Sequence, residues 1–431
     1  MSRSLSNWCC ASWIVLICGS AFAATHEPKP AEAFVDSIGV NTHFGNAMYP
    51  ENGYADRRVI AKLAALGVRH VRDHTWNDAG LKFIDELHKR HGIRATLVLG
   101  ETTRSPAELV RLLKAHPAYE AIEGLNEPDF TTRTYKTFTD DRKAGTYGAT
   151  RAFQEELYAA VKGDPKTKHI PVLSPAMGRS NRSQFLVPIP FDVAAMHRYA
   201  WEGKAAMEPG FGLNAAIADM GALRGDKPMW ATESGYYNEP AAHARAVPED
   251  VAGVYMPRLV GEFFWRGVAR TYLYEFVDQG TDKTQREQNF GLLRHDMTEK
   301  AAYVALKNLI EVVKEPPRPK VEPFVPQPLD FELAPAPHAK LQPLGQNVLQ
   351  KRDGTYVVLL WQQVSVFDAA AKTKIENPPI EQTFTTTQPF DVALHLPNES
   401  TTPTKQHRAV TSFKIEVPDR MLVITLTRPR P

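Results

Sequence analysis

Between residues 34 and 314, eight short apolar runs alternate with amphipathic helical patterns, and this repeat constrains the fold more than any other feature of the chain. Strands that alternate with helices predict a parallel sheet and an α/β fold class. No glycine-rich phosphate-binding loop follows the first strand, which favours a closed (β/α)8 TIM barrel over an open doubly wound sheet. The strand candidates are Ile38–Phe44, His70–Asp73, Ala95–Leu99, Glu120–Leu125, Ile170–Ser174, Phe191–His197, Pro228–Thr232 and Arg270–Val277.

The chain changes character after residue 314. Prolines are dense from Pro316 to Pro343, and because proline lacks a backbone donor we expect a linker over 315–344. Alternating apolar runs follow and predict a small C-terminal antiparallel β-domain over 345–431, a sandwich packed on the barrel. Its strand candidates are Asn347–Gln350, Thr355–Trp361, Phe390–His395, Ser412–Val417 and Met421–Thr427.

Residues 1–23 are typical of a cleavable secretory signal peptide. Arg3 precedes an apolar stretch from Cys9 to Ile17, and a small-x-small exit ends at Ala23. We therefore expect cleavage near Ala23 and a secreted or periplasmic protein. All three cysteines lie in this segment, so the exported protein would hold no thiol and no disulfide. Cys18 could carry a lipid anchor, but Ile17 stands where such signals prefer a small residue.

Charge and hydropathy exclude two classes of partner. The formal net charge of +2 is too balanced for nucleic acid or an anionic membrane to be the main partner. After the N-terminal segment, no stretch approaches the ~20 apolar residues that a membrane span needs. We expect a monomer with no nucleic-acid partner and no membrane span.

Two glutamates stand where apolar strands give way to loops. Glu127 lies in the run GLNEPD (124–129), and Glu233 lies in the run WATESGY (230–236). In a barrel of repeated strand–helix units, both carboxylates would lie at the same face and converge on one pocket. Glycoside hydrolysis needs two such groups, one to protonate the leaving oxygen and one to attack or stabilise the anomeric carbon. Asn-Glu-Pro alone is a common turn sequence, so the prediction depends on Glu127 and Glu233 occurring together.

The two motifs together resemble glycoside hydrolase clan A, and the run EGLNEPD is closest to family 39 and its exopolysaccharide-cleaving relatives, with Leu125 where a tryptophan is common. The resemblance implies Glu127 as acid/base and Glu233 as nucleophile of a retaining double displacement. It also implies that Asn126 binds the sugar 2-hydroxyl. Arg72 matches the clan arginine that holds the nucleophile ionised.

The resemblance extends to the sixth and eighth strands. His197 and Tyr199 match a His-x-Tyr position beside the nucleophile, whereas the eighth strand offers Tyr274, followed by Glu275 and Phe276, where many clan members place a tryptophan.

Other candidates come from the positions of residues in the pattern. His43 and Asn41 end the first strand, where each either lines the pocket or caps a loop. The aromatic residues Trp76, Trp201, Tyr236 and Tyr237 are candidate platforms for sugar rings, and both tryptophans could instead plug the barrel top. We expect Glu123 to be the salt-bridge partner of an arginine inside the barrel. Three segments should shape the cleft: Pro128–Tyr147, Gly178–Pro190 and Asn238–Pro248.

The sequence leaves three functions open. The first is a retaining glycosidase that acts on a polysaccharide or oligosaccharide, at a β-linkage as is usual in the clan. The second is a non-catalytic carbohydrate-binding or exopolysaccharide-assembly protein, and the third is a transglycosylase with the same residues. The glutamate pair favours an enzyme, because a binder has no reason to keep two like charges together. The mechanism requires no cofactor, and no second ligand at a metal-site spacing accompanies His197.

Overall fold

The computed structural model describes residues 24–45, 53–74, 77–200, 204–205, 212–239, 246–316, 323–339 and 342–429. Its first unit is a parallel barrel of eight strands, with the hydrogen-bonded order β10-β6-β5-β4-β3-β13-β12-β11. A parallel bridge between Leu173 and Val193 brings the two ends of this order together. The barrel strands are β3 (Ile38–Thr42), β4 (His70–Asp73), β5 (Arg94–Leu99), β6 (Tyr119–Leu125), β10 (Val172–Leu173), β11 (Ala194–His197), β12 (Met229–Ser234) and β13 (Arg270–Leu273).

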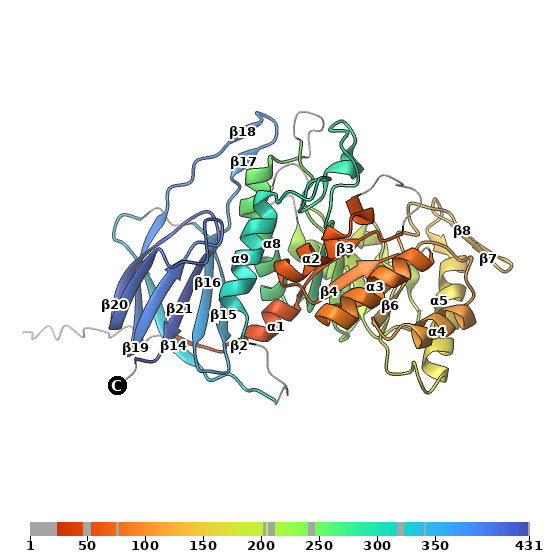
Figure 1. Ribbon diagram of the computed structural model, residues 1–431, viewed down its shortest axis with the longest axis horizontal. Coiled ribbons are helices and arrows are strands. Elements are labelled where there is room, and N and C mark those ends of the chain that lie inside the picture. The colour runs from red at the N-terminus through yellow and green to blue at the C-terminus, as the bar shows by residue number, and fades with distance from the viewer. Residues whose placement is uncertain are drawn as a thin grey trace, which may run out of the picture.

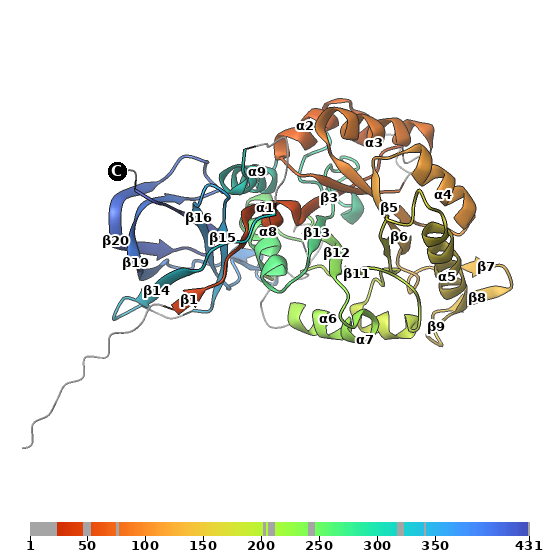
Figure 2. The same ribbon diagram turned by 90° about the horizontal axis from the view of Figure 1, so that it is seen from below.

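Helices alternate with these strands and surround the barrel (Figures 1 and 2). They are α1 (Ala31–Asp36), α2 (Arg58–Leu66), α3 (Asp78–His91), α4 (Pro106–Ala115), α5 (Gly148–Gly163), α6 (Leu213–Asp219), α7 (Gly221–Arg224), α8 (Glu249–Trp265) and α9 (Ala301–Val313), with 3-10 turns η1 (Gly53–Ala55), η2 (Ser180–Leu186) and η3 (Arg286–Asn289). The (β/α)8 barrel expected from the sequence is thereby confirmed. No helix in the described part of the chain combines the length and apolar character needed to cross a membrane.

Local sequence signals explain where the helices begin. At α4, Ser105 and Glu108 form a capping box and Pro106 occupies the first turn. At α3, the Asn77 side chain accepts a hydrogen bond from the Gly80 backbone N–H. Each cap satisfies donors that the first helical turn leaves unpaired.

A three-stranded antiparallel insertion follows the fourth barrel strand. It consists of β7 (Thr134–Tyr135), β8 (Phe138–Asp141) and β9 (Thr146–Tyr147), and it extends beyond α5 at the far end of the barrel from the C-terminal domain (Figure 1).

The C-terminal domain is built on one eight-stranded sheet in which β1-β14-β19-β21-β16-β15-β2 form a continuous order and β20 pairs with β19. The long strand β19 pairs with β14 through its first half and with β21 through its second half, so the sheet folds over an apolar core. The strands are β1 (Ala24–His26), β2 (Lys29–Pro30), β14 (Leu329–Pro335), β15 (Leu344–Gln350), β16 (Tyr356–Gln362), β19 (Ile380–His395), β20 (Lys405–Val417) and β21 (Leu422–Thr427), with a small hairpin of β17 (Phe367–Asp368) and β18 (Thr373–Lys374).

The structure differs from the expected linker over 315–344. Strand β14 lies inside that range and pairs with both β1 and β19. Leu329 and Phe331 are buried in the domain core, because alternate apolar residues between the prolines give this segment a strand pattern. The N-terminal residues 24–30 also pair with this sheet, so the domain is not confined to the C-terminal part of the chain.

Helix α8 belongs to the barrel and packs against the C-terminal domain (Figure 1). The Trp361 indole N–H donates to Glu262 Oε1 over 2.7 Å, and Arg258 donates to the backbone oxygens of Asp419 and Val364. Trp361 is fully buried against this helix, at Gly261. It therefore belongs to the interface core and offers no exposed platform.

Candidate active site

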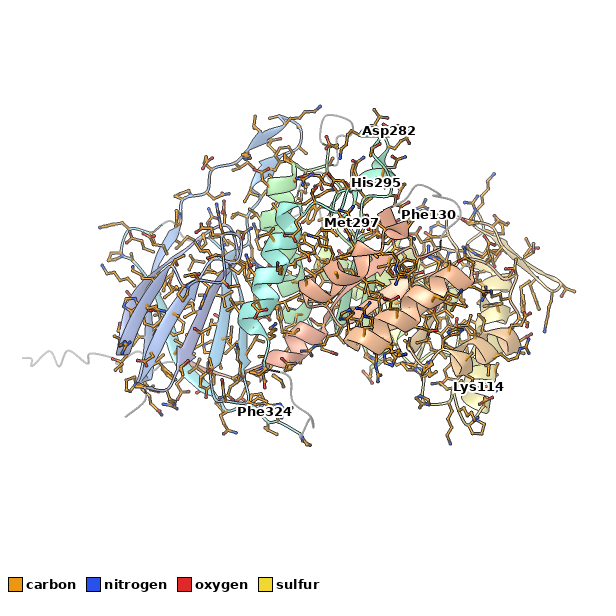
Figure 3. All side chains as sticks on the ribbon, in the orientation of Figure 1. Lys114, Phe130, Asp282, His295, Met297 and Phe324 are labelled. Atoms are coloured by element: carbon orange, nitrogen blue, oxygen red, sulfur yellow. The ribbon has the colours of Figure 1, made fainter. Side chains whose placement is uncertain are left out.

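A cavity of about 680 Å³ opens at the carboxyl ends of the barrel strands, and both Glu127 and Glu233 line it. Figure 3 shows Phe130 and His295 at this end of the barrel and Lys114 at the opposite end. The other described residues that line the cavity are His43, His74, Asn126, Phe130, Gly178, Arg179, Ser180, Asn181, His197, Arg198, Tyr199, Asp219, Tyr274, Arg286, Glu287 and Phe290.

Glu127 follows β6 and has a left-handed backbone conformation, with φ of 45°. Such a conformation is uncommon for a residue other than glycine and persists only where the surroundings enforce it. Hydrogen bonds hold the backbone on both sides of Glu127. Before it, Glu127 N–H donates to Ala176 O (2.9 Å) and Arg133 donates to Asn126 O (2.7 Å); after it, Glu127 O accepts from Phe130 N–H (2.9 Å). The Glu127 side chain is 26% exposed, so it meets whatever occupies the cavity.

Glu233 lies at the end of β12 and is held through both carboxylate oxygens. Arg72 Nη1 donates to Oε1 over 2.8 Å, and the Tyr199 hydroxyl donates to Oε2 over 2.7 Å. Only 11% of its side chain is exposed, and this small part faces the cavity. Glu233 is thus a fixed, mostly buried carboxylate with one accessible edge.

His197 lies between the two glutamates. Its Nδ1 lies 2.9 Å from Glu127 Oε1 and 3.6 Å from Glu233 Oε2. The nearest ligand-type atoms of the three side chains all lie within 4.8 Å of one another. The two carboxylates therefore approach each other closely enough to act on opposite sides of a single bond.

Arg72 is the buried centre of the hydrogen-bond network beneath the cavity. Its guanidinium donates twice to Glu123 (2.6 and 3.1 Å), and to Glu233 Oε1, Asn41 Oδ1 (2.9 Å) and Asn126 Oδ1 (2.7 Å). Glu123 is fully buried. The expectation that Glu123 pairs with an arginine inside the barrel is therefore confirmed, and the arginine is the one that also holds Glu233.

Opposing charges set the protonation of Glu233 and its neighbours. Burial alone would raise the pKa of Glu233, but the charges of His197 and Arg72, with hydrogen bonds from Tyr199 and Arg72, lower it to about 2. Burial alone would lower the pKa of His197, yet the nearby carboxylates of Glu233 and Glu127 outweigh burial and raise it. Likewise Glu123 and Glu233 overcome burial and raise the pKa of Arg72. Glu233 is therefore ionised over the physiological range.

Two neutral histidines, His43 and His74, also line the cavity. Burial lowers the pKa of His43 to about 4 and that of His74 to about 3. Their rings stack with centroids 6.2 Å apart. Behind them, burial raises the pKa of Glu275 well above its usual range, and its carboxyl accepts hydrogen bonds from Tyr54 and Gln279. Burial therefore disfavours charge on each of these three side chains.

The structure brings together part of the residue set expected from the sequence. Asn126, His197, Tyr199, His43 and Tyr274 line the cavity together with the two glutamates. The Tyr274 ring contacts His43 and Phe290 at centroid distances of 5.6 and 5.2 Å.

Arg72 and Asn41 lie beneath the cavity and contact the glutamate network. Both are buried, and Asn41 accepts a hydrogen bond from Arg72 while donating to Thr232 O (3.2 Å). Arg72 contacts Glu233 as the resemblance implies, whereas Asn41 lies against Arg72 and β12 and does not line the cavity.

Tyr236 also differs from the expectation. It is buried in the core, stacks on Tyr255 at 5.0 Å, and donates its hydroxyl proton to Lys204 O. A sugar ring has no access to it there. Trp76 and Trp201, the two tryptophan candidates, lie outside the described residues.

Sequence reasoning missed His74, Phe130, Arg179 and Arg286, all of which line the cavity. The signal for His74 was its position directly after the second barrel strand, where side chains face the site. Phe130 and Arg179 lie in segments that we expected to shape the cleft, but their composition did not single them out. Arg286 begins η3, a short turn whose position follows only from the folded loop after β13.

Glu127, His197 and Glu233 together could hold a divalent cation, since their ligand atoms are close enough. Two contacts oppose this. His197 Nδ1 is already within hydrogen-bond distance of Glu127, and the Arg72 guanidinium, which is fixed to Glu233, places a positive charge beside the site. A cation would therefore have to compete with a charge that the fold supplies itself.

Comparisons with solved structures bear on the fold. A family 39 glycoside hydrolase from the gut symbiont Bacteroides cellulosilyticus WH2 aligns with a TM-score of 0.54 and 14% identity, over 93% of this chain and 81% of that chain. A glucosidase from Croceicoccus marinus aligns with a TM-score of 0.57 and 11% identity, over 91% of this chain and 95% of that chain. No protein-family model and no curated protein sequence matches the chain. The chain has the fold of clan A glycoside hydrolases, as the sequence motifs indicate.

Proposed function

We propose that the protein is a retaining glycoside hydrolase that cleaves β-linkages of a polysaccharide or oligosaccharide. The observation that carries the proposal is the close approach of Glu127 and Glu233, whose nearest carboxylate oxygens lie within 4.8 Å. Retaining enzymes place their carboxyl groups about 5–5.5 Å apart, whereas inverting enzymes leave about 6.5–9.5 Å for a water molecule. The separation here fits direct attack by a carboxylate.

In the first step, Glu233 attacks the anomeric carbon while the bond to the leaving oxygen breaks. Its pKa of about 2 makes Glu233 an anion at neutral pH. Arg72 binds its Oε1 and Tyr199 binds its Oε2. Glu127 donates its proton to the leaving oxygen. The products of this step are a free leaving group and a glycosyl ester of Glu233.

In the second step, Glu127 is an anion and removes a proton from water, which attacks the anomeric carbon and releases Glu233. The His197 imidazole lies between the carboxylates, with its Nδ1 2.9 Å from Glu127 Oε1 and 3.6 Å from Glu233 Oε2, and it orients both of them. A transglycosylase would use the same first step and would accept a sugar hydroxyl in place of water.

The alternative of a non-catalytic binding protein fits the site less well. Burying Glu233 beside Arg72, His197 and Tyr199 requires a matched set of partners around one accessible oxygen edge. Binding of neutral sugars requires no such arrangement. The two solved structures of the same fold are described as a glycoside hydrolase and a glucosidase, which agrees with an enzyme.

The proposal includes export. Arg3, the apolar stretch after it and the small residues before Ala24 support a cleaved signal. Ala24–His26 form strand β1 and pair with β14, so cleavage after Ala23 would leave this strand intact. Mass spectrometry of the protein recovered from a culture medium or periplasm should give Ala24 as the first residue, and an intact N-terminus would contradict export by this route.

The test of the catalytic assignment compares the parent with Glu127→Gln and Glu233→Gln on β-linked polysaccharides and aryl β-glycosides. Both variants should lose at least about 1,000-fold in kcat on polysaccharide, because each lacks one half of the mechanism. Glu101→Gln, an exposed carboxylate after β5, is the matched control and should retain full activity. Hydrolysis that persists in both variants would overturn the assignment, and binding without hydrolysis by the parent would favour the binding protein.

A further inference from the structure

The loops after β6 and β10 carry arginines beside exposed aromatic rings at the edge of the cavity. Phe130 is 44% exposed and Phe185 is 43% exposed, although both are large apolar side chains. Arg142, Arg179 and Arg182 accompany them, from the β8–β9 turn and from η2 with the residue before it. These five residues are named the arginine–aromatic rim.

Contacts join the rim into one continuous surface. The Arg179 guanidinium lies 5.1 Å from the Phe130 ring centroid, and Arg142 donates a hydrogen bond to Phe130 O. Arg182 in turn donates to Arg142 O over 3.0 Å. Phe185 packs over Gly145, where a Cβ would lie 3.7 Å from its ring. The rim therefore runs from η2 across to the β7–β9 insertion.

The rim also continues into the cavity. Phe130 and Arg179 line the cavity themselves, and Phe130 N–H donates to Glu127 O over 2.9 Å. Phe130 lies flat on Gly178, where a Cβ would come within 2.2 Å of the ring. A glycan chain that leaves the cavity beside Glu127 meets this surface first.

Among the described residues, no carboxylate neutralises the arginines of the rim. Arg142 donates to Thr132 Oγ1 and Arg182 donates to the Tyr147 hydroxyl, and these acceptors are uncharged. In the part of the chain that the structure describes, none of the three rim arginines forms an ion pair.

Two nearby carboxylates already have other partners. Asp141 accepts hydrogen bonds from the backbone N–H groups of Lys143 and Ala144, and Asp219 accepts one from the Ser180 hydroxyl. Neither is within ion-pair distance of a rim arginine among the described residues. The rim therefore presents net positive charge next to apolar rings.

We propose that the rim binds the carboxylate groups of an acidic polysaccharide. A planar guanidinium matches a carboxylate through two parallel hydrogen bonds, and an aromatic face accepts the apolar face of a sugar ring. The rim holds both kinds of group, as binding of a uronate-containing chain requires. We place the leaving-group part of the substrate on the rim because of the proposed role of Glu127. The affinity of the rim for an acidic glycan does not depend on that role.

The test measures binding of the full protein by affinity electrophoresis in gels that contain a β-linked uronate polysaccharide. A second set of gels contains the same polymer after its carboxyl groups are reduced to alcohols, so that linkages stay and charge is lost. Arg179→Gln with Arg182→Gln should weaken binding to the acidic polymer about tenfold, at about threefold for each charge contact. The matched control, Arg111→Gln with Arg408→Gln, makes the same change in net charge on exposed arginines of α4 and β20, outside the rim, and should bind like the parent.

A second variant tests the rim without a change in charge. Gly178→Ala places a methyl group against Phe130 and should weaken binding to the acidic polymer several-fold. Gly163→Ala is its control, because a Cβ there meets no atom within 4 Å. Thermal unfolding of both variants shows whether any loss arises from misfolding.

The outcomes separate this inference from the proposed function. Equal binding to the acidic and reduced polymers, or rim variants that bind like their controls, would overturn the rim proposal even if Glu127→Gln abolishes hydrolysis. Binding that depends on the carboxyl groups of the polymer, and that the rim variants lose, would support the rim proposal. This holds even if hydrolysis does not depend on Glu127.

Discussion

Replacing Arg72 by methionine should destabilise the barrel and disable Glu233 together. Methionine keeps the apolar stem and removes the five guanidinium hydrogen bonds to Glu123, Asn41, Glu233 and Asn126. Glu123, which is fully buried, would then lose its only cation within 3.5 Å among the described residues. Removing one partner of a buried ion pair costs about 3–5 kcal/mol, because the other charge stays buried without compensation.

This magnitude can be measured as a shift in Tm. At about 2 °C per kcal/mol for a domain of this size, Arg72→Met should lower the Tm by about 6–10 °C. Adding Glu123→Gln to Arg72→Met removes the uncompensated charge, so the double variant should recover at least half of the loss. Differential scanning calorimetry of the parent and both variants provides the comparison.

Activity gives an independent readout of the same change. Loss of the Arg72 charge raises the pKa of Glu233, so the acidic limb of the kcat/KM profile should move to higher pH. A Tm shift below about 2 °C in the single variant, or a double variant no more stable than the single, would refute the reasoning about buried charge. An acidic limb that stays in place would refute the role of Arg72 in holding Glu233 ionised.

Three further predictions concern the hydrogen bonds and charges at Glu233. Tyr199→Phe removes one 2.7 Å hydrogen bond to the Glu233 carboxylate. The variant should lower kcat between about tenfold and about a hundredfold with little change in Tm. A loss of kcat under about threefold would contradict the role of this hydrogen bond. The pKa of Glu233 falls from 4.5 unfolded to about 2 folded, so its contribution to stability is complete above pH 4.5 and is lost as pH drops toward 2. The Tm of Glu233→Gln should therefore fall less steeply than the parent's between about pH 5 and pH 3, and parallel curves would contradict the shift. Dialysis against EDTA should leave hydrolysis unchanged, because Arg72 supplies the positive charge beside Glu233. A loss of activity that Ca²⁺, Mg²⁺ or Zn²⁺ restores would place a metal at Glu127, His197 and Glu233.

The barrel was predictable because the apolar strand recurs eight times, and an amphipathic helical pattern follows every strand except the fifth, where the structure has only the 3-10 turn η2. The ends of strands were predictable for the same reason, which is why Glu127 and Glu233 could be assigned to one face. The pairing of Glu123 with an arginine followed from strand alternation, since an acidic residue that points into a barrel needs a cation.

Sequence patterns did not predict which strands pair across long separations in the chain. The Thr25 hydroxyl donates to Asp330 across 305 residues, and nothing local in the short segment 24–30 indicates a partner there. Strand β14 was hidden by the surrounding prolines, although only its last residue, Pro335, is a proline. Proline density describes the segment as a whole, whereas pairing depends on the residues between the prolines.

The side chains after a strand end were the hardest to place. Gly235 has a φ of 156°, and a Cβ there would lie 2.5 Å from Tyr274 O. The chain turns at this close approach, which sends Tyr236 into the core against Tyr255. Strand alternation does not extend past such a turn, so the direction of Tyr236 could not be read from its position.

The measurement that tests the central claim most directly is the anomeric configuration of the first-formed product. Proton NMR of a β-linked substrate during the first minutes of hydrolysis, before mutarotation, distinguishes the two outcomes. Carboxylates within 4.8 Å of each other predict that the β-anomer appears first, by retention. Initial release of the α-anomer would show direct attack by water and would contradict Glu233 as the nucleophile.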